Sequence, residues 1–272
     1  MLHQRIALPT ADGSTIFMDA YVPRPSDSIE PDPRRAAVII FPGGGYGHVS
    51  EREGEPVALR FMAEGFNTFV VHYRVAPQVR YPLPQQDAAA AIGYVRRHAD
   101  ELLTDPHRVA VMGFSAGGHL ACSLGVWWPR AELWQPLGLS PEDVRPDAMV
   151  LSYPVITSGV FAHRGSFENL TGCADAADHA AFSLEDHVAP TTPPAFLWHT
   201  FDDDTVPVEN TLLLAAALRR CRVPAEVHVF PHGPHGASLA NAQSNGVVNA
   251  ARILPDCAAW PDMAARFLRS VL

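Results

Sequence analysis

The sequence predicts a protein of the α/β class, with a mostly parallel central sheet and helices on both of its faces. Three observations predict this class. Continuous apolar runs of five or six residues recur along the chain, as is typical of strands that are buried on both faces. Segments with helical periodicity alternate with these runs. The 272 residues, 47% of them hydrophobic, supply enough apolar material for a sizeable core. We therefore expect a single domain over residues 1–272.

The chain begins with a predicted β-hairpin over residues 4–22. Two β-rich runs, 5–8 and 15–22, flank a turn that contains Asp12-Gly13, a dipeptide that favours hairpin turns. The proline-rich, charged segment from 23 to 35 is then expected to be a surface loop.

The remaining strands and helices are predicted to alternate. Buried strands are expected at 36–41, 68–72, 109–113, 148–152 and 195–199, and an edge strand at 226–230, where apolar and polar residues alternate. Helices are expected at 53–64, 85–103, 116–126, 208–222 and 256–272. The irregular stretch 154–194 is long for a connection in a compact domain, so we expect it to form a small lid or cap at the C-terminal edge of the sheet.

Composition excludes several classes of function. The net charge of −9 disfavours nucleic acid as a partner. All basic residues are arginine, which excludes a phosphate-loop lysine, a kinase lysine and a Schiff-base lysine. The four cysteines lie far apart with no C-x-x-C pair, so neither a tetrathiolate zinc site nor a redox dithiol is expected. We expect no metal and no organic cofactor.

The sequence also lacks membrane signals. The first residues contain no apolar signal core, and no stretch approaches the roughly 18 consecutive apolar residues of a membrane helix. We therefore expect a soluble, cytoplasmic protein with no membrane partner. A homo-oligomer is compatible with the sequence.

One motif carries chemistry: Gly113-Phe114-Ser115-Ala116-Gly117 matches G-x-S-x-G between a predicted strand and a predicted helix. In this context the serine lies in a strained turn with its hydroxyl exposed, and glycines flank the turn because the neighbouring backbone is close. Ser115 is therefore the candidate nucleophile.

A serine nucleophile needs a histidine as base and an acid that orients it, following in the order serine, acid, histidine. Asp203 is the preferred acid and Asp202 the second choice, because both directly follow a predicted central strand. His232 and His235 both lie in the glycine-rich loop after the last strand, and their position in the chain does not separate them.

An oxyanion hole is predicted after the first buried strand, in Pro42-Gly43-Gly44-Gly45-Tyr46. The amide of Gly44, with that of Gly43 or Gly45, and the amide of Ala116 are the candidate donors. A phosphate cradle is excluded because His48 stands where G-x-G-x-x-G requires its last glycine.

Four aromatic residues are candidates for the substrate pocket. Tyr46 and Phe114 flank the oxyanion loop and the nucleophile, and Trp127 and Trp128 follow the nucleophile helix. The alternative for the tryptophans is packing in the core or at a subunit contact.

The motifs together resemble the α/β-hydrolase fold carboxylesterases related to hormone-sensitive lipase, and within them small bacterial acetyl esterases similar to acetylxylan esterases. The resemblance spans almost the whole chain. It comprises PGGGY (42–46), YRVAP (73–77), YPLPQQD (81–87), GFSAGGHLA (113–121), PPAFLWHT (193–200), VPVEN (206–210) and GPHGASLA (233–240).

The resemblance selects between the alternatives that the residues leave open. The family pattern G-x-H-G-x-S-L-A places the catalytic histidine at His235, and the D-x-x-V-P spacing places the acid at Asp203. The chain departs from the wider family at Pro42, where histidine commonly precedes the glycines and orders the loop.

The leading hypothesis is a serine carboxylesterase that hydrolyses short-chain esters, acetyl above all, of sugars or small alcohols. The first alternative is a serine peptidase or amidase of the same fold, although the chain has no additional propeller domain to restrict access of peptides. The second is a non-catalytic binding protein on a hydrolase scaffold.

Overall fold

The structure, a computed structural model, describes residues 1–272 and is built around one eight-stranded sheet with the order β1-β2-β4-β3-β5-β6-β7-β8. β1 pairs with β2, and β2 with β4, in antiparallel register, whereas all other neighbours are parallel. The strands are β1 (Leu2–Pro9), β2 (Thr15–Val22), β3 (Arg35–Phe41), β4 (Asn67–His72), β5 (Thr104–Phe114), β6 (Ala148–Ser152), β7 (Ala195–Thr200) and β8 (Ala225–Phe230).

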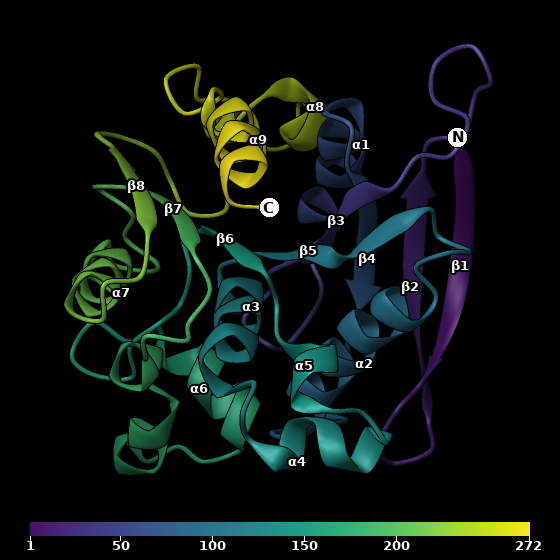
Figure 1. The fold of residues 1–272 in the computed structure, drawn as a ribbon. Coiled ribbons are helices and arrows are strands. Elements are labelled where there is room, and N and C mark those ends of the chain that lie inside the picture. Colours follow the sequence, from purple (N-terminus) through teal and green to yellow (C-terminus); the bar gives the residue numbers. More distant parts are fainter.

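Helices cover both faces of the sheet (Figure 1). Apolar residues of α1 and α9 pack on one face, and those of α2, α3 and α7 pack on the other. The helices are α1 (Glu55–Ala63), α2 (Leu83–Arg97), α3 (Ala116–Trp127), α4 (Ala131–Trp134), α5 (Pro141–Val144), α6 (Arg164–Thr171), α7 (Glu209–Arg220), α8 (Ala242–Asn245) and α9 (Trp260–Val271). Five 3₁₀ helices add to them: Glu51–Glu53, Gln135–Leu137, Ala176–Phe182, Leu184–His187 and Ala250–Arg252. None of the helices is both long enough and apolar enough to cross a membrane.

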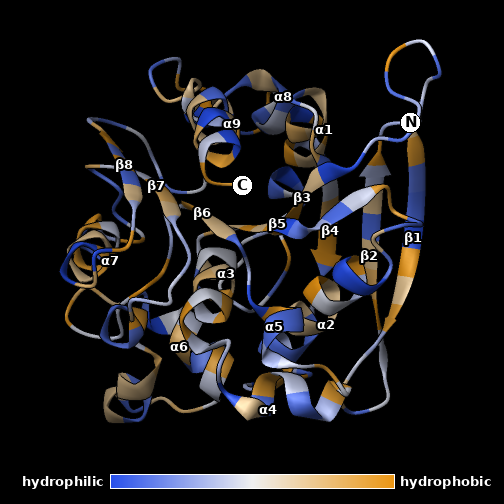
Figure 2. Ribbon diagram, viewed as in Figure 1, coloured by the Kyte–Doolittle hydropathy of each residue, from blue (hydrophilic) through white to orange (hydrophobic).

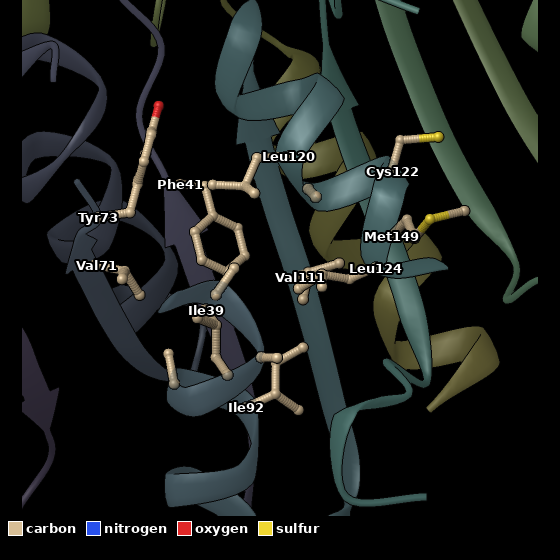
Figure 3. Packing of buried hydrophobic residues seen from close by; sticks show 14 of the residues in the cluster. Ile39, Phe41, Val71, Tyr73, Ile92, Val111, Leu120, Cys122, Leu124 and Met149 are labelled. Atoms are coloured by element: carbon tan, nitrogen blue, oxygen red, sulfur yellow. The ribbon is translucent and has the colours of Figure 1, made fainter. Parts of the chain in front are cut away.

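The core forms two layers, one on each side of the sheet. Figure 3 shows the larger layer, where Ile39 and Val111 of the strands meet Ile92 of α2 and Leu120 of α3. In the other layer, α9 turns Trp260, Phe267 and other apolar residues towards the sheet, and Figure 2 shows that the same helix also carries hydrophilic residues. This two-sided burial explains why the central strands read as uninterrupted apolar runs.

The predicted class and strands are confirmed. The hairpin, the five buried strands and the edge strand all form, and β8 lies at the end of the sheet with alternating exposure, as expected. The helix predicted over 85–103 is too long, since α2 ends at Arg97. The chain then turns, and the carbonyls of Leu102 and Leu103 accept hydrogen bonds from the side-chain amide of Asn67 on β4 instead of continuing a helix.

The carboxyl ends of the parallel strands meet at one edge of the sheet, where the predicted site residues follow them. The stretch 154–194 contains α6 and two of the 3₁₀ helices, and it approaches this edge: the side-chain amide of Asn169 on α6 donates to the carbonyl of Gly45 at 2.9 Å. This contact joins that stretch to the loop after β3.

Candidate active site

Ser115 occupies a sharp turn between β5 and α3. Its backbone has φ 54° and ψ −121°, a left-handed conformation that is strained for any residue with a side chain. The turn is fixed by its surroundings, because the amide of Ser115 donates to Ser152 O on β6 and the carbonyl of Ser115 accepts from the amide of Val155. The strain is therefore held by the sheet on which the turn rests.

The glycines of the motif are required by close backbone contacts. A Cβ on Gly113 would lie 2.1 Å from the carbonyl oxygen of Gly117. A Cβ on Gly117 would lie 2.1 Å from the carbonyl oxygen of Phe41 at the end of β3. Any side chain at either position would push α3 away from the sheet, which accounts for glycine at both.

Ser115, His235 and Asp203 form one continuous chain of hydrogen bonds. His235 Nε2 lies 2.8 Å from Ser115 Oγ, and His235 Nδ1 lies 2.7 Å from Asp203 Oδ2. The three residues come from the loops after β5, β7 and β8. An imidazole in this position can take the proton of the serine hydroxyl while the carboxylate fixes its orientation.

The environment of Asp203 keeps its carboxylate charged. Burial alone would raise the pKa of Asp203, but hydrogen bonding from His199 and His235 lowers it well below its ordinary value. The amides of Thr205 and Val206 also donate to Oδ1, at 3.0 and 2.9 Å.

Asp202, the second choice for the acid, and His232, the other candidate histidine, pair with each other. His232 Nδ1 lies 3.0 Å from Asp202 Oδ2, and the His232 side chain is 86% exposed. The structure thus brings His235 and Asp203 to Ser115 and leaves His232 and Asp202 paired with each other at the surface.

The oxyanion loop corrects one predicted donor. The amide of Gly43 donates to Glu53 Oε2 at 2.8 Å, so this amide is not free to bind substrate. The amides of Gly44, Gly45 and Ala116 have no acceptor within the protein, and Gly44 and Gly45 line the cavity beside Ser115. Gly43 is needed for space instead, since a Cβ there would lie 2.7 Å from Phe114 O.

Two residues hold this loop where the wider family commonly has a histidine. Tyr73 Oη donates to the carbonyl of Pro42 at 2.6 Å, and Glu53 accepts from the next amide. Glu53 is buried, and its other carboxylate oxygen accepts from Tyr153 Oη at 2.7 Å. Burial, together with the Glu53 carboxylate, raises the pKa of Tyr153 well above its ordinary value, so the phenol stays protonated and can donate.

The Glu53–Tyr153 contact extends to the histidine loop. Tyr153 Oη accepts from the amide of Ser238 at 2.8 Å, and its ring lies edge-on to His235 with the centroids 5.0 Å apart. One hydrogen-bonded chain therefore links the oxyanion loop to the loop of His235. The sequence did not point to Glu53 or Tyr153, because their roles depend on contacts across up to a hundred residues of chain.

A cavity of about 320 Å³ opens above Ser115 and His235. Its lining is polar or glycine throughout and contains no hydrophobic residue: Gly44, Gly45, His48, Ser50, Arg52, Glu53, Ser115, His163, Thr205, His235, Gly236 and Arg252. Burial and the neighbouring His235 lower the pKa of His163, so this imidazole is neutral near pH 7.

The predicted aromatic pocket is wrong, because none of its four residues lines this cavity. Phe114, the last residue of β5, lies in the same core layer as Met112 and packs on Trp260. Tyr46 is buried and bonded to His119. Trp127 is buried against Tyr81 and Phe182, and Trp128 lies under the guanidinium of Arg145.

The remaining histidines and acids do not gather into a metal site. No group of three or more histidine, cysteine, aspartate or glutamate side chains has an arrangement that could hold a metal ion.

Comparison with known proteins places the chain in a family. A family model described as BD-FAE matches residues 18–150. The chain is 38% identical over 214 residues to an endo-1,4-beta-xylanase B of Butyrivibrio fibrisolvens, covering 77% of this chain and 34% of that protein. It is 31% identical over 212 residues to an acetylxylan esterase of Xylanibacter ruminicola, covering 75% of this chain and 42% of that protein. The chain thus spans less than half the length of these two curated relatives.

A solved structure matches over most of both chains. The crystal structure of an acetyl ester-xyloside bifunctional hydrolase from Caldicellulosiruptor lactoaceticus has a TM-score of 0.80 and 38% sequence identity, covering 95% of this chain and 89% of that one. The fold and these similarities show that the chain belongs to the esterases of the α/β-hydrolase fold.

Proposed function

We propose that this chain is a serine carboxylesterase that hydrolyses short-chain esters, above all acetyl esters, of sugars or small alcohols. The observation that carries the proposal is the hydrogen-bonded chain Ser115–His235–Asp203 at the floor of a cavity that also exposes free backbone amides. The acetylxylan esterase and the acetyl ester-xyloside hydrolase among its relatives support an acetyl ester of a sugar.

In the proposed mechanism, Ser115 Oγ attacks the ester carbonyl while His235 Nε2 takes the hydroxyl proton. The negative charge that develops on the carbonyl oxygen is stabilised by the amides of Gly44, Gly45 and Ala116. His235 then gives its proton to the departing alcohol, which leaves an acetyl group on Ser115. Water, activated by His235 in the same way, releases acetate and restores the serine.

The neighbours of the triad support these roles. The lowered pKa of Asp203 keeps that residue anionic, so it can stabilise the imidazolium that forms on His235. In this proposal residues 1–272 act as one domain, and the stretch 154–194 serves as a small cap that contributes His163 to the cavity. A cytoplasmic location and a homo-oligomer stay predictions.

A panel of p-nitrophenyl esters from acetate to octanoate tests the proposal, together with acetylated sugars and an aminoacyl anilide. We expect kcat/KM to be highest for acetate or propionate and to fall by hexanoate. No hydrophobic side chain lines the cavity, so a longer acyl chain gains only part of the roughly 0.8 kcal/mol per methylene that full apolar burial supplies. A maximum at octanoate, or activity confined to the anilide, would contradict the acetyl esterase.

A further inference from the structure

Two arginines flank the backbone of the histidine loop at the cavity. Arg252 Nε donates to the carbonyl of His235 at 2.8 Å, and Arg52 Nη1 donates to the carbonyl of Gly236 at 2.6 Å. Both side chains line the cavity with Ser115. A Cβ on Gly236 would lie 3.4 Å from Arg52 Nη2 and 3.7 Å from Arg252 Nε, so the two guanidinium groups border the same space.

Neither guanidinium is neutralised by the protein. Their side-chain partners are the neutral amides of Asn245, 3.1 Å from Arg52 Nη1, and Asn249, 3.3 Å from Arg252 Nη1. No carboxylate lies within 4 Å of either group, whereas Arg74 elsewhere in the chain pairs with both Asp12 and Asp87. The Nη2 groups of both cavity arginines have no acceptor.

The acids around the pair are occupied by other contacts. Glu53 is the acidic residue of the cavity lining, and its two oxygens accept from the Gly43 amide and from Tyr153. Asp203 has a fully buried side chain and pairs with His235. The two guanidinium groups repel each other, and an anion between them would offset this repulsion. Their free N–H groups therefore suit an anion that enters the cavity from outside the protein.

The side of the site on which the pair lies indicates which part of the substrate carries the charge. In the proposed mechanism, on which this inference rests, His235 Nε2 gives its proton to the departing alcohol oxygen, so the alcohol lies next to His235. Arg52 and Arg252 bind the backbone carbonyls of residues 235 and 236 and line the cavity beside His235, so we place them on the alcohol side. We infer that they form a subsite for a carboxylate on the alcohol, so that the preferred substrates are acetyl esters of acidic alcohols such as hydroxy acids or acidic sugars.

Two acetate esters that differ only in charge test the subsite: 4-acetoxyphenylacetate and its neutral amide. The methylene insulates the ring from the charged group, so the leaving phenols are similar in reactivity. We expect the wild-type protein to prefer the carboxylate by roughly tenfold or more in kcat/KM at low salt. The preference should decrease as sodium chloride rises from about 20 mM to about 500 mM, since salt screens the attraction.

Variants then test whether the two arginines cause the preference for the carboxylate ester. Arg52→Gln and Arg252→Gln should each bring the ratio of the two kcat/KM values towards one, and the corresponding lysine variants should keep part of the preference. Arg219→Gln is the matched control, because Arg219 is exposed at the end of α7 without an ion pair, and it should keep the wild-type ratio. The ratio is the readout because a disturbed histidine loop lowers both rates together. If a glutamine variant does not fold, the salt dependence of the wild-type ratio and the ratios of the lysine variants decide whether the subsite exists.

The outcomes separate this inference from the proposed function. A wild-type ratio near one, or an unchanged ratio in both glutamine variants, would overturn the subsite while hydrolysis of the neutral ester upheld the esterase. If the wild-type protein hydrolysed neither ester, the proposed function would fail. Calorimetry with 4-hydroxyphenylacetate would then decide the subsite: binding that is lost in the glutamine variants supports it, and absence of binding to the wild-type protein overturns it.

Discussion

Replacing Glu53 by glutamine tests whether a buried carboxylate holds the oxyanion loop. Glu53 is 2% exposed, and its two oxygens accept hydrogen bonds from the amide of Gly43 and from Tyr153 Oη, at 2.8 and 2.7 Å. Glutamine has nearly the same shape but only one acceptor oxygen. With its oxygen on the Gly43 amide, glutamine presents an N–H group to Tyr153 Oη, which can accept it, but the hydroxyl hydrogen of Tyr153 then loses its acceptor.

The expected loss follows from these two contacts. A hydrogen bond to a charged group contributes about 1.5–3 kcal/mol, and a buried donor without an acceptor costs about 1–3 kcal/mol. In Glu53→Gln the bond to Gly43 becomes a neutral one and the buried hydroxyl hydrogen of Tyr153 has no acceptor, so we expect the free energy of unfolding to fall by about 3 kcal/mol. Because Gly44 and Gly45 follow the anchored amide, kcat should also fall by about tenfold or more while KM changes less, since a donor of an oxyanion hole is worth about 10²–10³ in rate.

Urea unfolding and steady-state hydrolysis of p-nitrophenyl acetate measure the two effects. Glu51→Gln is the matched control, because Glu51 is an exposed residue of the same 3₁₀ helix, and a change within about 0.5 kcal/mol is expected there. A loss of less than about 1 kcal/mol in Glu53→Gln, with an unaltered kcat, would refute the reasoning that this carboxylate positions the loop.

Further substitutions test the triad and a buried histidine. Ser115→Ala should lower ester hydrolysis by about 10⁴-fold or more with the fold intact, and substantial activity in the purified variant would refute the nucleophile. His235→Ala should be as damaging, whereas His232→Ala should be mild because that side chain lies at the surface; a reversed order would exchange their roles. Burial lowers the pKa of His119 to about 4, below the value of about 6.5 in the unfolded chain, so stability is lost as the pH falls from about 6.5 towards 4. Urea unfolding should show the wild-type protein losing about 2 kcal/mol more than His119→Gln between pH 7 and pH 5, and equal losses would contradict this.

The parts of the fold that the sequence predicted correctly are those with local signals. The run 109–113 is apolar at every position because β5 is covered on both faces, and Asp12-Gly13 marks a turn through its own backbone preferences. The four-residue helix α4 has no such signal, since one turn is too short for a periodic pattern. The end of α2 has no local signal either, since neither glycine nor proline follows Arg97 before residue 104.

The candidate site likewise has parts with a local sequence signal and parts that depend on contacts between distant residues. The motif around Ser115 could be found because glycines at 113 and 117 are forced by backbone contacts within the strand–turn–helix unit and with β3. The hydrogen bond from the Gly43 amide to Glu53 could not be predicted, because only the folded chain brings the Glu53 side chain next to Gly43. The side chain of Phe114 was assigned to the pocket from its place beside Ser115, but Phe114 is the last residue of β5 and shares the face of Met112, so the aromatic ring lies in the core.

This correction changes where selectivity can arise. An aromatic wall would select a substrate by shape and apolar burial, and each added methylene would change the binding free energy. The cavity of this protein instead presents imidazoles, hydroxyls and two guanidinium groups around the hydrogen-bonded serine. A polar site discriminates most strongly against a substrate that leaves its buried donors unpaired. Selectivity should therefore depend more on the polar and charged groups of the alcohol than on the length of the acyl chain. The ratio of kcat/KM for the charged acetate ester to kcat/KM for the neutral one should accordingly exceed the ratio between acetate and propionate esters of the same alcohol.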